Sequence, residues 1–98
     1  MTGSAGPMAA ILHAKLEAAF APEHLEVLDE SERHRGHAGW REGGETHFRV
    51  VMRSARFDGM ERVARSRAVH AVLHAELRDR VHALALQLSG AGEAARQA

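Results

Sequence analysis

The 98-residue chain has no cysteine and no tyrosine, and its aromatic residues are three phenylalanines and one tryptophan. Without cysteine it can form no disulfide, no thiol nucleophile and no thiolate metal site of its own. An iron–sulfur cluster could be held only if another molecule supplied the sulfur ligands. Because aromatic residues are so few, the core must consist mainly of valine, leucine, alanine and methionine side chains.

Long apolar runs are also absent, because no stretch approaches the ~20 residues that a membrane-spanning helix needs. The first residues lack the basic start and the apolar segment of a signal peptide. The formal net charge is zero, so no overall field attracts the chain to nucleic acid or to a membrane. We therefore expect a cytoplasmic protein that is not associated with a membrane.

Hydrophobic periodicity predicts five elements in the order helix, strand, strand, helix, strand. The first helix follows Pro7 and ends at Ala21-Pro22, because the residue before a proline is disfavoured in the α conformation. The second helix has an apolar stripe, and Asp58 is a candidate cap at its start. The predicted ranges are 24–29, 46–53 and 81–88 for the strands and 60–78 for the second helix.

This order predicts an α+β fold in which a three-stranded mixed sheet has both helices on one face. The first two strands would pair antiparallel, and the second helix would form a parallel β-α-β crossover to the third strand. The glycine-rich residues 30–45 are expected to form a long loop. The predicted domain covers 7–88, with flexible tails over 1–6 and 89–98.

Eight histidines are many for a chain of this length, and they are the main candidates for chemistry. His70 and His74 lie one helical turn apart and could bind a metal ion, but a solvated helix face accounts for them better. The chain has no G-x-S-x-G, P-loop or G-x-G-x-x-G motif, which argues against nucleophilic hydrolysis and nucleotide chemistry. We therefore expect a binding protein and not an enzyme.

His82 is the most informative histidine, because it begins an apolar strand in phase with Leu84, Leu86 and Leu88. A histidine in that phase is most often a buried core residue with one ring nitrogen bonded to the backbone. Its position at the start of the strand places it at the sheet edge, where a second histidine could meet it. Periodicity alone therefore favours a structural role for His82 and leaves a ligand role open.

The basic run 49–67 is the second candidate site, with six arginines against two acidic residues. Its arginines could contact nucleic-acid phosphates, and we single out Arg62, Arg65 and Arg67. No aromatic platform and no convincing helix-turn-helix spacing accompany them, so a solvated surface explains the run better. The preference for arginine over lysine is typical of a GC-rich bacterial genome and carries no chemical weight.

Taken in order, the motifs resemble those of the BolA-like family. The match extends over about four-fifths of the chain, from the first helix through the third strand, and the stretches that carry it are LEVLDES (25–31), ETHFRVVMRSARFDG (45–59), RVARSRAVHAVLHAEL (62–77) and VHALAL (81–86). The resemblance implies a class II KH-like α-β-β-α-β topology, which the periodicity also predicts. It further implies a non-enzymatic adaptor that shares a [2Fe-2S] cluster with a monothiol (CGFS) glutaredoxin, in cluster trafficking or in iron or redox sensing.

On this resemblance, the glutaredoxin cysteine and glutathione supply sulfur, and the chain supplies two further ligands. One would be His82, in the V-H-A-L-A motif. The other would be His34, three residues after the Glu30-Ser31 pair, with His37 as a close competitor. Imidazole is a suitable iron ligand, and the lack of cysteine agrees with sulfur from a partner. The isolated chain, as a monomer or weak homodimer, would bind no cluster.

Two functions other than cluster sharing remain open, which are DNA binding and protein binding without a metal. Some relatives are implicated as DNA-binding transcriptional regulators, a role that the 49–67 basic face could serve. The family usually has R-H-R in the second helix, whereas this chain has Arg65-Ser66-Arg67, which puts one contact to a partner or to nucleic acid in doubt. A protein-interaction domain without any metal is the third possibility.

Overall fold

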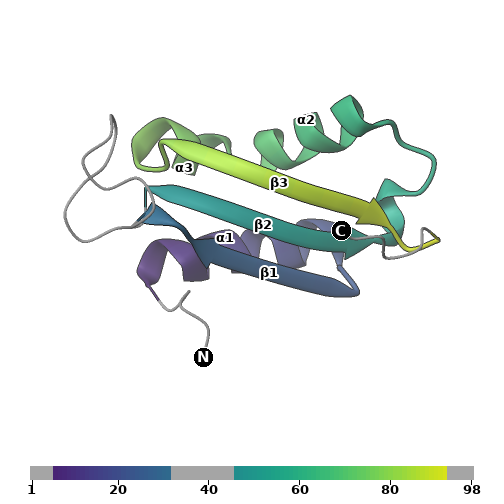
Figure 1. Ribbon diagram of the computed structural model, residues 1–98, viewed down its shortest axis with the longest axis horizontal. Helices are drawn as coiled ribbons and strands as arrows, with labels where there is room; N and C mark the ends of the chain where they lie inside the picture. The colour runs from purple at the N-terminus through teal and green to yellow at the C-terminus, as the bar shows by residue number, and fades with distance from the viewer. Residues whose placement is uncertain (1–5, 32–45, 93–98) are drawn as a thin grey trace.

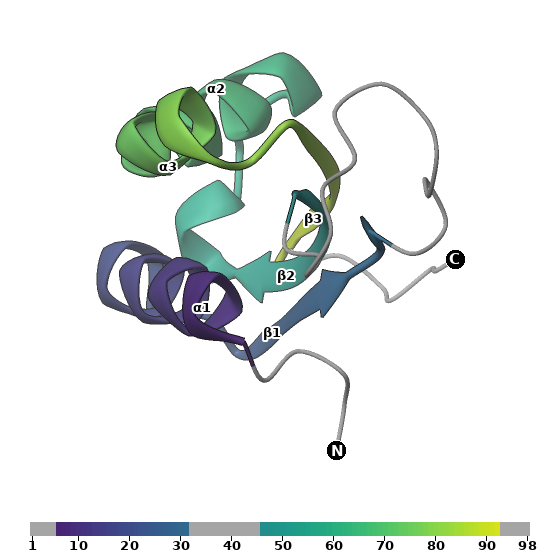
Figure 2. The same ribbon diagram turned by 90° about the vertical axis from the view of Figure 1, so that its left-hand side faces the viewer.

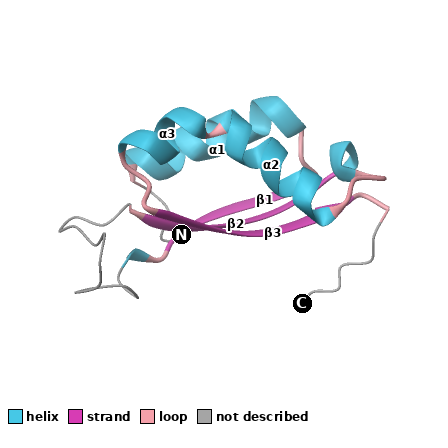
Figure 3. Ribbon diagram, turned by 90° about the horizontal axis from the view of Figure 1, so that it is seen from above, coloured by secondary structure: helices cyan, strands magenta, loops and turns pink. Residues whose placement is uncertain are grey.

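A computed structural model describes residues 6–31 and 46–92. The described part forms one three-stranded sheet in the order β1-β2-β3, and its helices cover one face of that sheet (Figures 1 and 3). This is the predicted α+β arrangement. The elements are α1 (Pro7–Phe20), β1 (His24–Asp29), β2 (His47–Ser54), the 3-10 turn η2 (Ala55–Phe57), α2 (Arg62–Val72), α3 (His74–Asp79) and β3 (Ala83–Gly90).

Helix α1 begins and ends where the sequence predicts. Pro7 takes the first helical position. A backbone N–H at that position would have no intrahelical acceptor, so the N–H that proline lacks is not needed there. At the other end Ala21 adopts the left-handed conformation, with φ 43° and ψ 55°, and its N–H donates to the carbonyl of Glu17 at 3.0 Å. Because Pro22 follows, the chain cannot continue as a helix and turns back into β1.

The sheet is mixed, as predicted. Strands β1 and β2 pair antiparallel, with Val27 opposite Val50, and β2 and β3 pair parallel, with Val50 beside Leu86. The parallel pairing needs a crossover connection, which α2 and α3 provide. It follows that β2 and β3 start at the same end of the sheet, where β1 ends (Figure 2).

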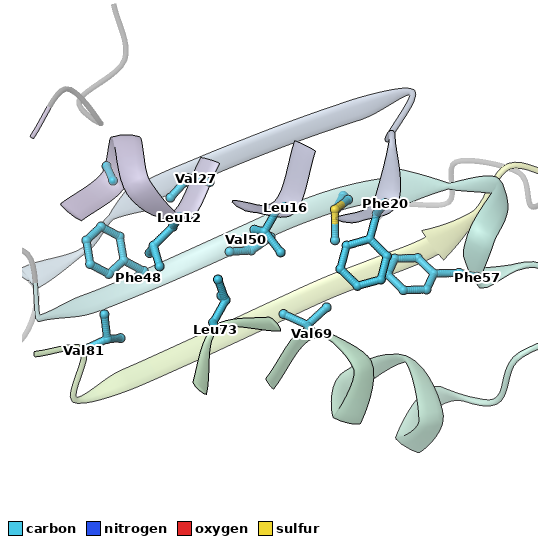
Figure 4. Close-up of a cluster of buried hydrophobic side chains, with 12 residues drawn as sticks. Leu12, Leu16, Phe20, Val27, Phe48, Val50, Phe57, Val69, Leu73 and Val81 are labelled. Carbon is cyan, nitrogen blue, oxygen red and sulfur yellow. The ribbon is translucent and has the colours of Figure 1, made fainter. Parts of the chain in front are cut away.

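The core lies between the helices and the sheet (Figure 4). Leu12 and Leu16 of α1 are fully buried over the central strand, and the rings of Phe20 and Phe57 pack with their centroids 5.0 Å apart. At the rim Lys15 donates to both carboxylate oxygens of Glu76, at 3.0 and 2.9 Å, and joins α1 to α3. The buried apolar residues are Ala9, Leu12, Leu16, Phe20, Val27, Phe48, Val50, Met52, Phe57, Val69, Leu73 and Val81.

The second predicted helix, over 60–78, is divided in two. Leu73 has φ −100° and ψ 18°, so α2 ends before it and the short α3 follows. The prediction that Asp58 caps this helix is wrong, because α2 starts only at Arg62 and Asp58 lies outside its first turn. The Asp58 carboxylate instead accepts a hydrogen bond from the N–H of Gly92, at 3.2 Å, beyond the end of β3.

The third strand is shifted two residues from the predicted 81–88, so Ser89 and Gly90 of the predicted tail belong to the sheet. Residues 1–5, 32–45 and 93–98 lie outside the described part, and with them most of the predicted loop and tails. Among the described helices, none combines the length and the apolar character that crossing a bilayer requires.

The core predicts a clear stability contrast along α1. Leu16→Ala removes a side chain that is 0% exposed and should lower the free energy of unfolding by about 2–5 kcal/mol, through lost burial and a cavity. Ile11→Ala on the same helix removes a side chain that is 43% exposed and should cost less than about 1 kcal/mol. Urea unfolding followed by circular dichroism measures both values, and equal losses would contradict the packing described.

Candidate metal-ligand site

His82 lies directly before β3, and its side chain is exposed. Its N–H and that of Ala83 both donate to the carbonyl of Thr46, at 2.7 and 3.1 Å. Because two successive donors share one acceptor, the alternation of the strand is interrupted there, and Val81 is the residue that enters the core, 3% exposed. His82 is therefore not the buried core histidine that its phase with Leu84 favours.

A second histidine does meet His82, and it comes from β2. The ring of His47 is centred 5.4 Å from that of His82, with an angle of 53° between the ring planes. The parallel register places His47 beside Ala83, the residue that follows His82. His47 is 4% exposed, so the pair consists of one buried and one accessible imidazole. The predicted loop ligands His34 and His37 lie outside the described residues.

The hydroxyl of Ser31 joins the end of β1 to the start of β2. It donates to the Asp29 carboxylate at 2.6 Å and accepts from the N–H groups of Thr46, at 2.9 Å, and His47, at 3.2 Å. The N–H of Ser31 also donates to the Asp29 carboxylate, at 2.9 Å. These bonds hold together the two residues, Ser31 and Thr46, that bracket residues 32–45, and Thr46 in turn binds the backbone of His82.

Charged groups at this end of the sheet are paired across strands. The Arg49 guanidinium donates to the Glu30 carboxylate at 2.9 Å, and both side chains are partly buried. The N–H of Glu30 donates to the carbonyl of His47 at 2.7 Å, so the antiparallel pairing continues one residue beyond β1. The His47 backbone is therefore fixed at both its N–H and its carbonyl by the two residues that follow β1.

No three histidine, aspartate or glutamate side chains within 6–31 and 46–92 gather as a metal-binding group. What the start of β3 offers is one accessible imidazole, His82, beside the buried imidazole of His47. His70 and His74 do not share a helix, because the break at Leu73 falls between them, and the ring Nδ1 of His70 donates to the carbonyl of Ser66 at 2.9 Å.

The three arginines singled out on the basic run are placed differently. Arg62 and Arg67 are exposed on α2. Arg65 is turned inward: its Nε donates to the carbonyl of Met60 at 2.9 Å, and its guanidinium carbon lies 6.0 Å from the centre of the Phe57 ring. A further contact, to the carbonyl of Leu88 at 3.4 Å, links Arg65 to β3, so it fastens the start of α2 to the sheet.

Sequence reasoning missed His47, Thr46 and Ser31 as members of this site. His47 falls within the predicted strand 46–53, and the sequence patterns assign it no role. A signal was nevertheless present, since a parallel crossover sets the start of the second strand beside the start of the third. Applying that register to ETHF and VHAL would have brought the two histidines together.

The model of the family described as BolA-like protein matches residues 16–93. The chain belongs to the BolA-like family. It is 49% identical over 86 residues to BolA-like protein 1 of Mus musculus, covering 88% of this chain and 60% of that protein. It is 50% identical over 72 residues to the DNA-binding transcriptional regulator BolA of Escherichia coli K12, covering 74% of this chain and 65% of that protein.

Solved BolA structures share the fold. The BolA domain of SufE1 from Arabidopsis thaliana superposes with a TM-score of 0.80 at 35% identity, covering 88% of this chain and 94% of that domain. The family resemblance drawn from the motifs is thus confirmed. The chain spans about 60% of the length of the mouse relative. The relatives come from animals as well as bacteria, so a bacterial source for this chain stays a prediction.

We predict that loss of the Ser31 hydroxyl lowers the stability of the protein and weakens the hydrogen bonding at Thr46 and His47. Ser31→Ala removes the acceptor of two N–H groups, those of Thr46 and His47, and should cost about 1–3 kcal/mol of unfolding free energy for each donor left unsatisfied. Amide hydrogen exchange at Thr46 and His47 should accelerate. Ser89→Ala on β3 is the matched control and should leave both rates unchanged; similar rates in the two variants would refute the assignment.

Proposed function

We propose that this protein is a non-enzymatic BolA-like adaptor that shares a [2Fe-2S] cluster with a monothiol glutaredoxin, and that His82 is one of its ligands. The observation that carries the proposal is the exposure of His82 at the start of an apolar strand. A histidine kept only for packing would be buried there, as Val81 is. Its accessible imidazole can reach a group held by another molecule.

The composition supports the same proposal. With no cysteine, the chain cannot supply the thiolates on which such clusters usually depend. In the proposed heterodimer the glutaredoxin cysteine and glutathione provide sulfur, the cluster supplies one-electron redox chemistry, and the BolA-like chain provides imidazole nitrogen. Alone it would be a cytoplasmic monomer or weak homodimer without a cluster.

The second ligand is proposed to be His34, with His37 as the alternative. His34 follows Ser31 by three residues, a distance that an extended chain spans in at most ~10 Å, whereas His37 has a reach of ~20 Å. Ser31 is hydrogen-bonded to Thr46, which binds the backbone of His82. Because Ser31 is tied in this way to the residue that binds His82, the shorter chain separation from Ser31 favours His34 over His37 as the second ligand.

Anaerobic reconstitution with the glutaredoxin, iron, sulfide and glutathione tests the ligand assignment. His82→Ala should abolish the visible circular dichroism of the shared cluster or shorten its lifetime at least tenfold, because one iron loses a protein ligand. His74→Ala, an exposed histidine on α3, is the control and should behave as the wild type. A normal spectrum and lifetime for His82→Ala would show that His82 is not a ligand.

The same reconstitution decides between the loop histidines. We expect His34→Ala to perturb the cluster spectrum and lifetime strongly, since the proposed second ligand is lost, and His37→Ala to have a small effect. The double variant shows whether one histidine substitutes for the other. The opposite order of effects would assign the ligand to His37, and no effect in either variant would remove the loop from the ligand set.

DNA binding is the second candidate function, favoured by the name of the Escherichia coli relative and by the exposure of Arg62 and Arg67. If each arginine neutralises one phosphate, the slope of log K against log salt should become shallower by ~1.8 in Arg62→Glu with Arg67→Glu. Arg78→Glu on α3 is an exposed control. Arg65 is left intact because it holds α2 to β3. An unchanged slope would exclude this face.

A further inference from the structure

We propose that His47, although it touches the ring of His82, is a positioning residue and not the second ligand. In this inference Thr46 holds the His47 ring in the tautomer that carries its proton on Nε2, and that ring orients the imidazole of His82. The inference rests on the proposed cluster-sharing function and assigns a role to a residue that neither the motifs nor the relatives' names single out.

The first step is the hydrogen-bond capacity of Ser31. A hydroxyl has one proton to donate and two lone pairs that accept. The carboxylate of Asp29 can only accept, so the Ser31 proton is directed to it, at 2.6 Å. Both lone pairs of Ser31 are used by the N–H groups of Thr46 and His47, at 2.9 and 3.2 Å. Ser31 therefore has no capacity left for a further donor.

The second step concerns the hydroxyl of Thr46, which is fully buried and so needs an acceptor for its proton. Its neighbours are the Ser31 hydroxyl, 3.4 Å away and already saturated, and Nδ1 of the His47 ring at 2.9 Å. The proton therefore goes to Nδ1. Because Nδ1 accepts, the neutral His47 ring carries its own proton on Nε2.

The third step is that this tautomer prevents His47 from acting as an iron ligand. Iron binds an imidazole nitrogen through its lone pair, and in this ring the Nδ1 lone pair is occupied by Thr46 while Nε2 carries a proton. To become a ligand, His47 would have to break a buried hydrogen bond or lose its Nε2 proton. His47 instead has the role of residues that surround a metal-binding histidine without touching the metal. Such residues fix the orientation of the imidazole that binds the metal, which here is that of His82.

The fourth step is how His47 and Thr46 act on His82 together. The Thr46 carbonyl accepts the N–H of His82 at 2.7 Å and so fixes its backbone. The ring of His47, which the Thr46 hydroxyl holds, lies 5.4 Å from the ring of His82 and limits its rotation. One residue thus positions both the main chain and, through His47, the side chain of the proposed ligand.

The isolated protein provides the first test, without any cluster. In ¹⁵N-labelled protein, at a pH where imidazoles are neutral, we expect the long-range spectra of His47 to show the proton on Nε2. Thr46→Val keeps the size and the backbone carbonyl but removes the hydroxyl, and should give a mixture of tautomers and shift the ring signals of His82. Thr46→Ser should restore the wild-type pattern. A proton on Nδ1 in the wild type would overturn the inference.

The reconstituted heterodimer provides the second test. Pulsed EPR of the reduced cluster counts coordinated imidazole nitrogens, and this count should be the same in the wild type, in His47→Phe and in Thr46→Val. The cluster lifetime should nevertheless fall several-fold in both variants, since His82 is held less firmly. His24→Phe, at the opposite end of the sheet, is the matched control and should change neither value. A lower nitrogen count in His47→Phe would make His47 a ligand and overturn the inference.

The two tests separate this inference from the proposed function. If His82→Ala leaves the cluster unchanged, the proposed function fails, while the spectra of the isolated protein still decide the tautomer of His47 and its contact with His82. If His82→Ala destroys the cluster but the two positioning variants keep the wild-type lifetime, the adaptor function stands and the positioning role is wrong.

Discussion

The backbone and hydroxyl of Thr46 connect three segments that are far apart in the sequence. The N–H binds Ser31 at the end of β1, the hydroxyl binds the ring of His47 at the start of β2, and the carbonyl binds the backbone of His82 at the start of β3. Each of these groups lies at a sheet end, where regular pairing stops and buried polar atoms would otherwise lack partners. Thr46 satisfies them with a single residue.

This arrangement depends on the parallel pairing of β2 and β3. In an antiparallel pair the start of one strand meets the end of the next, and ETHF would then lie far from VHAL. The crossover through α2 and α3 brings both starts to one end. The core therefore acts on the site indirectly, because Leu73 and Val69 hold the crossover helices on the sheet and so preserve the register that puts His47 beside His82.

Most of the architecture could be predicted from the sequence, because hydrophobic periodicity reports directly on burial. The limits of β1 were predicted to the residue and those of α1 to within about one residue, since Pro7 and Pro22 mark the ends of the helix. The break at Leu73 was not predicted. Leu73 is fully buried, so the apolar stripe of the predicted helix continues through it and gives no sign of the break. Asp58 is of a residue type that often caps helices, but residues 59–61 separate it from α2, and Glu61 occupies the cap position.

The site was harder to predict than the fold. The phase of His82 with Leu84 indicates a buried ring, whereas two N–H groups on one carbonyl interrupt the strand and expose it. Such an interruption has no hydrophobic signature, so periodicity cannot report it. His47 illustrates the converse: its alternation with Arg49 gives no sign of burial, yet it is 4% exposed and its ring contacts that of His82. Periodicity reports neither feature, because strand register and hydrogen bonding determine both positions.

A site of this kind has a consequence for binding. One exposed imidazole is too few ligands for a metal centre, so in the proposed function the cluster binds well only when both proteins contribute. Binding of the cluster and binding of the partner are then thermodynamically linked, and each must strengthen the other by the same factor. A rigid His82 increases this coupling, because an imidazole that is already oriented loses less conformational freedom when iron binds it. The hydrogen bonds of Thr46 would therefore contribute to how tightly the two proteins hold each other as well as to the ligand geometry.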